Sequence, residues 1–391
     1  MKIAIFCETY LPYINGVVTH IKLLKEGLER MGHEVLIVTA DPRTRHHYIK
    51  DHVLYCPARE SKRLYGYGIA SPLSRRRLKL IREFDPNIIH IHQEFGVGLS
   101  GFMIAKVLHK PIVYTLHTMY DEYIYYVAPK PLIPVVRSLS HTYSRILAKA
   151  ASELTGPSPK VEEYFKKVGA KKQVNVVPNS VELSNFEPSK ITEEQKAAVY
   201  KKLNIPKDKK IACFCGRLGK EKSVDVLLQY WAEQIKPEDN ILLMVIGDGP
   251  ELENLQRQAK ELDIEDTVIF TGKVLHEELP PYLAVCDMYI TASLSDTNSI
   301  SMLEAMAVGL PVLHRKDPLN KGQVLAGVNG YIYDNSAELF DHIHDLMTME
   351  EDRKKTLRRS VIESVKKSGA EDLANHILTI YNRLYLPVDK R

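Results

Sequence analysis

The stretch Lys2-Ile3-Ala4-Ile5-Phe6-Cys7-Glu8 opens the chain with an apolar run, which leads through a turn containing Gly16 into a helical stretch over Thr19–Met31. A second apolar run follows at Val35–Thr39. Both runs are continuously apolar instead of alternating, which is typical of strands buried on both faces of a parallel sheet. The opening strand–helix–strand unit therefore predicts an α/β fold in which helices cover the sheet.

The same alternation continues along the chain and occurs twice. Further buried strands are predicted at Ile88–Ile91, Ile112–Leu116, Ile211–Cys215, Leu242–Ile246, Thr267–Phe270 and Met288–Thr291. A polar segment that contains Pro188 and Pro206 separates the two series. We therefore expect two doubly wound, Rossmann-like parallel-sheet domains that face a cleft, with ligands beyond the carboxyl ends of the strands. The expected boundaries are 1–180 for the first domain, 181–205 for a linker, 206–370 for the second domain and 371–391 for a helical tail.

The composition restricts the class of protein. The chain has 391 residues, of which 45% are apolar and 26% charged, which is typical of a globular protein and excludes wholesale disorder. No run approaches the ~18 apolar residues that a membrane-spanning helix needs, and the first apolar run is too short for a signal peptide. The five cysteines lie mostly in apolar runs, which favours reduced thiols in a cytosolic protein.

The net charge of +4 hides an asymmetry between the two halves. Residues 1–180 carry 26 lysines and arginines against 15 acids, whereas the rest of the chain carries 27 against 34. The basic half includes the cluster Arg75, Arg76, Arg77 and Lys79, and tyrosines are interleaved with its basic residues: Tyr65, Tyr67, Tyr120, Tyr123, Tyr125 and Tyr126. This pattern fits nucleic acid or anionic membrane headgroups, and each cluster alone also fits a solvated surface.

Glycines and cations follow several of the predicted strands. Gly16 stands at the start of the first helix, where free N–H groups and the positive dipole end favour a phosphate. The segment Gly216-Arg217-Leu218-Gly219-Lys220-Glu221-Lys222 places two fixed cations, Arg217 and Lys222, where they would neutralise a diphosphate. Gly247 belongs to the turn Gly247-Asp248-Gly249-Pro250, which would line a nucleotide pocket with backbone groups.

Two acids and one histidine complete the candidate site. Asp296 lies in a polar turn, and Glu304 follows eight positions later on a predicted helix, so the two reach different hydroxyls of one elongated polyol. The backbone N–H groups of Thr297, Asn298 and Ser299 are candidates for the same ligand. His117 ends a strand of the first half and so faces the expected cleft. No group of histidines and carboxylates has metal-ligand spacing, so no metal site is predicted.

Together these motifs resemble the retaining GT-B glycosyltransferases, in the large family that includes sucrose synthase, phosphatidylinositol mannosyltransferase and bacterial glycolipid synthases. The most specific element is the acid-x7-acid motif joined to Glu304-Ala305-Met306-Ala307 and Gly309-Leu310-Pro311-Val312. Within the family, the segments Glu8–Val18, His90–Gly98 and Val113–Tyr126 look most like diacylglycerol 3-glucosyltransferases. The resemblance implies transfer of a hexose from a UDP-sugar to diacylglycerol or a glycosyl-diacylglycerol. Glucose is the first candidate for this hexose.

The resemblance also implies roles for single residues. Gly16, Gly216 and Gly247 would approach the donor, Arg217 and Lys222 would hold its diphosphate, and Glu304 its ribose. His117 and the Asp296 position would bond the transferred sugar. The chain departs from the family where Asp296 replaces the usual glutamate and Ser299 the usual glycine, which leaves the identity of the sugar open. No metal or other cofactor is expected, because cations and a helix dipole take up the leaving charge.

Partners and location follow from the same resemblance. The first domain would face the acceptor lipid and an anionic membrane surface, with Arg75, Arg76, Arg77 and Lys79 toward it, and the second would bind the nucleotide sugar. We expect no nucleic acid partner, and a peripheral position on the cytoplasmic face of the cell membrane. Two alternatives stay open: the same donor with a non-lipid acceptor (teichoic acid, polysaccharide or a small metabolite), and a non-enzymatic protein that binds sugar nucleotides or polyanions.

Overall fold

The computed structural model describes residues 1–13, 15–61, 67–119, 121, 124, 128–320 and 322–385; of residues 61 and 67 it describes the backbone alone. The chain forms two compact units, one made of Met1–Ser180 together with Gly369–Arg391 and the other of Val181–Ser368. Each unit has its own sheet and its own apolar core.

The sheet of the first unit has the strand order β3-β4-β2-β1-β6-β7-β8-β9, with β5 paired to β4. Its pairings are parallel except those of β4 with β3 and β5. The bounds of the strands are β1 (Lys2–Phe6), β2 (Glu34–Asp41), β3 (Tyr48–Lys50), β4 (Val53–Ser61), β5 (Tyr67–Ala70), β6 (Ile88–Ile91), β7 (Ile112–Thr115), β8 (Glu153–Gly156) and β9 (Val174–Val176).

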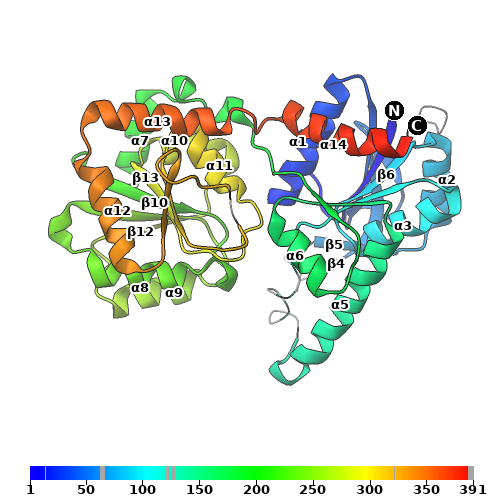
Figure 1. The fold of residues 1–391 in the computed structure, drawn as a ribbon, viewed down its shortest axis with the longest axis horizontal. Coiled ribbons are helices and arrows are strands. Elements are labelled where there is room, and N and C mark those ends of the chain that lie inside the picture. The colour runs from blue at the N-terminus through cyan, green and yellow to red at the C-terminus, as the bar shows by residue number, and fades with distance from the viewer. Residues whose placement is uncertain are drawn as a thin grey trace. The chain divides into compact units, whose positions relative to one another are not determined.

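Helices cover both faces of this sheet (Figure 1). They are α1 (Gly16–Arg30), α2 (Arg75–Phe84), α3 (Gly96–Leu108), α5 (Ile133–Ala150), α6 (Pro159–Lys167) and α14 (Ala370–Tyr385). The last of these, α14, returns from the far end of the sequence and packs against α1, where Leu373, Ile377 and Tyr381 are buried. The segment expected to be a helical tail is therefore part of the core of the first unit.

The second unit has a parallel six-stranded sheet in the order β12-β11-β10-β13-β14-β15. Its strands are β10 (Lys210–Cys215), β11 (Ile241–Ile246), β12 (Val268–Gly272), β13 (Met288–Thr291), β14 (Val312–Arg315) and β15 (Gly330–Tyr333). Its helices are α7 (Glu193–Leu203), α8 (Val224–Gln234), α9 (Leu252–Glu261), α10 (Leu279–Ala284), α11 (Ile300–Ala307), α12 (Ser336–Thr348) and α13 (Glu351–Val365).

The predicted fold class is confirmed: both units are Rossmann-like parallel sheets covered by helices. The first strand of each series, β1 and β10, lies inside its sheet, as its continuous apolar sequence indicated. The segment 181–205, expected to be a linker, contains α7 and contributes Val181, Phe186 and Val199 to the core of the second unit. Among the described residues, no helix is long and apolar enough to span a membrane.

Candidate functional site

Two glycine-containing loops pack backbone to backbone at the carboxyl ends of β10 and β11. Gly216 and Gly247 have φ values of +157° and +142°, in the region that favours glycine. A Cβ atom built on Gly247 would lie 1.9 Å from the carbonyl oxygen of Gly216, so no side chain fits there. The Leu218 N–H donates to the carbonyl of Asp248 at 2.9 Å and fixes one loop on the other. Both candidate nucleotide loops thus belong to one rigid corner.

The two cations of the first loop lie in different surroundings. Arg217 is partly buried, and burial lowers the pKa of its guanidinium although Glu221 acts in the opposite direction. Lys222 donates from Nζ to Oδ1 of Asp296 at 2.5 Å, across 74 positions of sequence. From the sequence, Lys222 is expected at the diphosphate and Asp296 at the sugar; the pairing of the two is seen only in the structure.

Asp296 is a largely buried carboxylate held in its charged form. Burial alone would raise its pKa, but the charge of Lys222 and hydrogen bonds from Lys222 and Ser293 outweigh burial, so the pKa lies below its ordinary value. His314 adds to the lowering. The pair Lys222–Asp296 is therefore an ion pair at neutral pH, fixed between the turn after β10 and the turn after β13.

Ser299 caps the N-terminus of α11, and its backbone and side chain are hydrogen-bonded to neighbouring residues. Its Oγ accepts from the N–H of Met302, and its own N–H donates to Oε1 of Gln323 at 2.9 Å. Gln323 returns a hydrogen bond from Nε2 to the Ser299 carbonyl at 2.7 Å. The predicted use of the Ser299 N–H for a ligand would thus require Gln323 to give way. Thr297 and Asn298 lie in the preceding turn.

Glu304 lies on α11 with only 5% of its surface exposed, and it has a partner that the sequence analysis missed. His276 Nε2 lies 2.7 Å from Glu304 Oε1. The second acid of the motif is therefore held in place by a histidine from the turn before α10. The spacing of 28 residues between the two gives no periodic signal, so only the tertiary structure reveals this pair.

In the first unit, Gly16 is the first residue of α1. Asn15 caps this helix, because its Oδ1 accepts from the N–H of Val18 at 3.0 Å. The first turn of α1 carries no acidic side chain. Its dipole end is therefore not neutralised from within the helix, as the phosphate interpretation of Gly16 requires.

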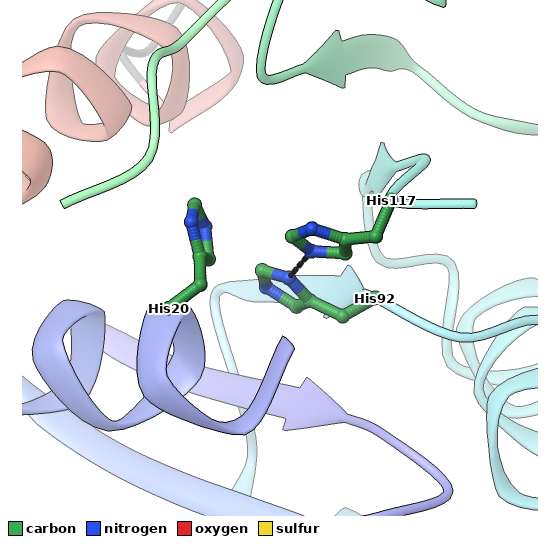
Figure 2. Close-up of side chains that lie close together, drawn as sticks. All are labelled: His20, His92 and His117. Carbon is green, nitrogen blue, oxygen red and sulfur yellow. Dashed lines mark hydrogen bonds between the residues drawn. The ribbon is translucent and has the colours of Figure 1, made fainter. Parts of the chain in front are cut away.

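His117 follows β7 and lies in a cluster of imidazoles (Figure 2). Its Nε2 lies 2.9 Å from Nδ1 of His92, which follows β6. Burial, with smaller contributions from the neighbouring rings His20 and His90, holds the pKa of His117 well below its ordinary value, so the ring is neutral at pH 7. A neutral imidazole can donate to or accept from an uncharged hydroxyl, and it brings no positive charge to a phosphate.

The basic cluster of α2 divides into exposed and buried members. Arg75, Arg76 and Lys79 are exposed, as a membrane-facing role requires. Arg77 is not: it is 1% exposed and donates from Nε to the Cys56 sulfur and from Nη1 to the Ser71 carbonyl. The prediction that Arg77 faces a membrane is therefore wrong, because its guanidinium holds the loop before α2 onto β4.

Of the tyrosines predicted to lie among these cations, the structure describes only the backbone of one. Tyr65, Tyr120, Tyr123, Tyr125 and Tyr126 lie outside the described residues, and Tyr67 is described by its backbone in β5. The helix α5 extends away from the sheet (Figure 1), and its exposed residues form a different apolar surface. Leu132, directly before α5, and Val135, Leu139 and Ile146 on α5 recur at spacings that place them along one side of the helix, and each is more than half exposed. This stripe was not predicted from the sequence.

Comparison with known proteins gives matches across both units. The model of "Glycosyltransferase Family 4" matches residues 14–185, and that of "Glycosyl transferases group 1" matches residues 195–361. The chain is 30% identical over 390 residues to an alpha-monoglucosyldiacylglycerol synthase of Acholeplasma laidlawii, covering 97% of this chain and 96% of that protein. A protein of the same name from Streptococcus pneumoniae is 29% identical, over 97% of this chain and 85% of that protein.

Solved structures show the same fold at lower identity. A sucrose-phosphate synthase from Thermosynechococcus elongatus superposes with a TM-score of 0.75 at 17% identity, covering 98% of this chain and 99% of that one. The Anabaena protein HepE in complex with UDP gives a TM-score of 0.73 at 17% identity, covering 98% of this chain and 100% of that one.

Proposed function

The chain belongs to the retaining GT-B glycosyltransferases of family 4, and we propose that it transfers a hexose from a UDP-sugar to diacylglycerol or a glycosyl-diacylglycerol. Glucose is the first candidate for this hexose. The observation that carries the proposal is the 30% identity, over almost the whole of both chains, to an alpha-monoglucosyldiacylglycerol synthase. The donor part has further support in HepE, a structural relative that was solved with UDP.

In the proposed donor site, the second unit holds the nucleotide. Gly216 and Gly247 bring backbone close to the donor, Arg217 and Lys222 neutralise its diphosphate, and Glu304 bonds the ribose hydroxyls. The supporting observation is that the groups are already fixed: the two loops by their backbone contact, and Glu304 by His276. Fixed groups need no reorganisation when charge develops on the leaving diphosphate.

The proposed transfer needs no metal ion, since Arg217, Lys222 and the N-terminus of α1 at Gly16 supply positive charge toward the phosphates. Asp296 and His117 bond the transferred sugar in this proposal. Oδ1 of Asp296 is paired with Lys222, and this charge makes the carboxylate a weaker nucleophile. We therefore favour front-face attack, in which the acceptor hydroxyl loses its proton to the departing phosphate oxygen and the sugar keeps its anomeric configuration.

The lipid acceptor implies contact with a membrane, and two surfaces of the first unit support it. Around α2, Arg75, Arg76 and Lys79 are exposed beside Leu73, which has 73% of its surface exposed. The second surface is the apolar stripe of Leu132, Val135, Leu139 and Ile146 along α5, which also carries the exposed cations Arg145 and Lys149. Cations beside exposed apolar side chains are typical of helices that lie on anionic lipid surfaces.

The test is an assay with defined donors and acceptors. Purified protein is incubated with radiolabelled UDP-glucose, UDP-galactose or GDP-mannose in the presence of diacylglycerol vesicles, with and without EDTA, and lipid products are separated. We expect a glycosyl-diacylglycerol from a UDP-hexose with EDTA present. Donor hydrolysis without a lipid product would support a non-lipid acceptor, and no reaction with any donor would favour a non-enzymatic protein.

A further inference from the structure

Three imidazoles from separate elements of the first unit converge on one point. His20 comes from α1, His92 follows β6 and His117 follows β7, and one ring nitrogen from each lies within 4.8 Å of the others. Figure 2 shows the three rings turned toward one another. We propose that His20, His92 and His117 form a binding site for a zinc-class divalent metal ion, and that metal bound there inhibits the transferase.

His20 is already held in the form that ligates a metal. Its Nδ1 lies 3.0 Å from Oδ1 of Asn179, and an amide oxygen only accepts, so Nδ1 carries the proton and Nε2 the lone pair. That Nε2 is buried and has no hydrogen-bond partner among the described residues. A metal-binding histidine is usually oriented in this way, with its other N–H donated to an oxygen.

His92 offers a second nitrogen of the same kind. Its Nδ1 and Nε2 of His117 are 2.9 Å apart, so one of these two atoms donates to the other. The Nε2 of His92 is buried and is also without a partner in the part of the chain that the structure describes. With Nδ1 as the donor, this Nε2 carries a lone pair. A metal ion would engage two buried nitrogens that the protein leaves unsatisfied, at the cost of the single His92–His117 hydrogen bond.

His90 is excluded from the site by its own contacts. Its ring lies 4.1 Å from that of His92, but its Nδ1 is 2.6 Å from the Tyr381 hydroxyl and its Nε2 is 2.7 Å from the Thr115 hydroxyl. Both nitrogens are therefore in use. The described metal-ligating group contains three imidazoles and neither a carboxylate nor a thiolate.

The chemistry of the three ligands selects the metal. Imidazole suits Zn²⁺, Co²⁺ and Ni²⁺, whereas Mg²⁺ and Ca²⁺ require oxygen ligands. Tetrahedral zinc with Zn–N bonds of about 2.0–2.1 Å needs nitrogens about 3.4 Å apart, so the widest spacing here must close by about 1.4 Å. Such an adjustment is within reach of side-chain rotation, and three protein ligands leave the fourth position open.

Inhibition follows from His117, and this part of the inference rests on the proposed function. If His117 bonds the transferred sugar, a metal ion that takes its ring nitrogen withdraws that contact. Zinc should then lower turnover and EDTA should restore it. This is the opposite of the response of a metal-requiring transferase, which loses activity in EDTA.

The binding test does not depend on activity. Untagged full-length protein is freed of metal with EDTA, desalted and titrated with Zn²⁺ by calorimetry, and with Co²⁺ by visible absorption. We expect one tightly bound ion and the intense absorption of tetrahedral Co²⁺, with no binding of Mg²⁺. His20→Gln and His92→Gln should each weaken Zn²⁺ binding by about tenfold or more. The matched control is His33→Gln/His52→Gln: His33 follows α1 and lies beside Met1, and His52 lies in the turn between β3 and β4 beside Glu29.

Three outcomes would overturn the site. They are absence of Zn²⁺ binding by the wild type, binding that survives both His20→Gln and His92→Gln, and binding that only the His33→Gln/His52→Gln control removes. X-ray absorption spectroscopy of the wild-type zinc complex tests the site even if a variant fails to fold. Three histidine ligands are expected, and a coordination shell made mostly of oxygen would contradict the proposal. Zinc that binds at the triad without lowering turnover would contradict only the inhibitory role.

Discussion

Lys222 and Asp296 form an ion pair between two loops of the second unit, with Nζ 2.5 Å from Oδ1 and side-chain exposures of 22% and 12%. The pair connects the turn after β10 to the turn after β13. The residue proposed to contact the diphosphate and the residue proposed to contact the sugar therefore hold each other in place. Taking either charge away leaves the other largely buried without its partner, which is far more costly than losing an exposed pair. A substitution at either residue is therefore expected to affect the other.

Replacing either loop cation should reduce catalysis strongly. Arg217→Ala and Lys222→Ala should each lower turnover by roughly 10²–10³, because each removes a charge aimed at the developing diphosphate.

Lys222→Ala should also lower the free energy of unfolding, by about 3–5 kcal/mol if Asp296 stays charged. In the double variant Lys222→Ala/Asp296→Asn, stability should recover while turnover stays low, which urea unfolding and steady-state kinetics separate. Lys220→Ala, at an exposed neighbour, is the control, and near-normal turnover in both cation variants would refute the proposed diphosphate site.

Asp296→Glu should change the choice of sugar and leave nucleotide binding nearly unchanged. The substitution restores the usual acid of the family and lengthens the side chain by one methylene, so its carboxylate meets different hydroxyls of the hexose. Glu304, fixed by His276, is untouched. Kinetics with UDP-glucose and UDP-galactose, together with the Kd for UDP, measure both effects. A large change in the Kd for UDP with the same sugar preference would show that the roles of the two acids are wrongly assigned.

Local patterns explain how much could be predicted from the sequence. Continuous apolar runs such as Ile88–Ile91 and Leu242–Ile246 predicted strands, because burial on both faces leaves a signal within a few residues. The contacts that hold the candidate site are of another kind. His276–Glu304, Lys222–Asp296 and His92–His117 join residues 25 to 74 positions apart, and no periodicity records them. Arg77 was misjudged for a related reason: a run of arginines does not show which member turns inward.

The buried histidines predict a loss of stability in mild acid. Burial lowers the pKa of His20 to about 4, and the pKa values of His90, His92 and His117 shift in the same direction. Below pH 6.5 the unfolded chain binds protons that the folded chain does not, so the free energy of unfolding falls as the pH drops from 6.5 toward 4. His20 alone accounts for about 3 kcal/mol over that range.

Urea unfolding in EDTA between neutral pH and about pH 5 measures this effect. His20→Gln should flatten the pH dependence, whereas His52→Gln, at an exposed site, should not. Equal stability of the wild type across this range would contradict the neutral, buried state of the cluster.

Adding a single methyl group at Gly27, in the contact between α1 and α14, should destabilise the protein. A Cβ on Gly27 would lie 2.2 Å from the carbonyl oxygen of Ala370 and 2.8 Å from Cβ of Ala374. Gly27→Ala gains about 1 kcal/mol of helix propensity, but it forces α14 away from α1 and loses buried contacts. We expect a net loss of about 1–2 kcal/mol by urea unfolding. Arg30→Ala, at an exposed position of α1, should change stability by less than about 0.5 kcal/mol, and a Gly27→Ala protein more stable than wild type would show that the two helices are loosely packed.

Membrane docking should divide between charge on α2 and apolar surface on α5. Each cation near an anionic surface contributes about 1 kcal/mol, so Arg75→Ser/Arg76→Ser/Lys79→Ser should weaken binding to anionic vesicles about 100-fold and remove most of its salt dependence. Arg77 is left intact, because its loss would disturb the fold. Val135→Ser/Leu139→Ser should weaken binding at every salt concentration, since burial of apolar surface is not screened by ions.

Co-sedimentation with neutral and anionic vesicles, at low and high salt, measures both contributions. The matched control for charge is Arg353→Ser/Lys355→Ser/Arg359→Ser, which removes three exposed cations from α13 of the second unit. If that control lowers binding as much as the α2 variant, then net charge and not the α2 surface attracts the protein. If binding ignores lipid charge and salt but falls with Val135→Ser/Leu139→Ser, then α5 alone holds the lipid. Binding that none of these variants lowers would place the docking surface outside both helices and remove this support for a lipid acceptor.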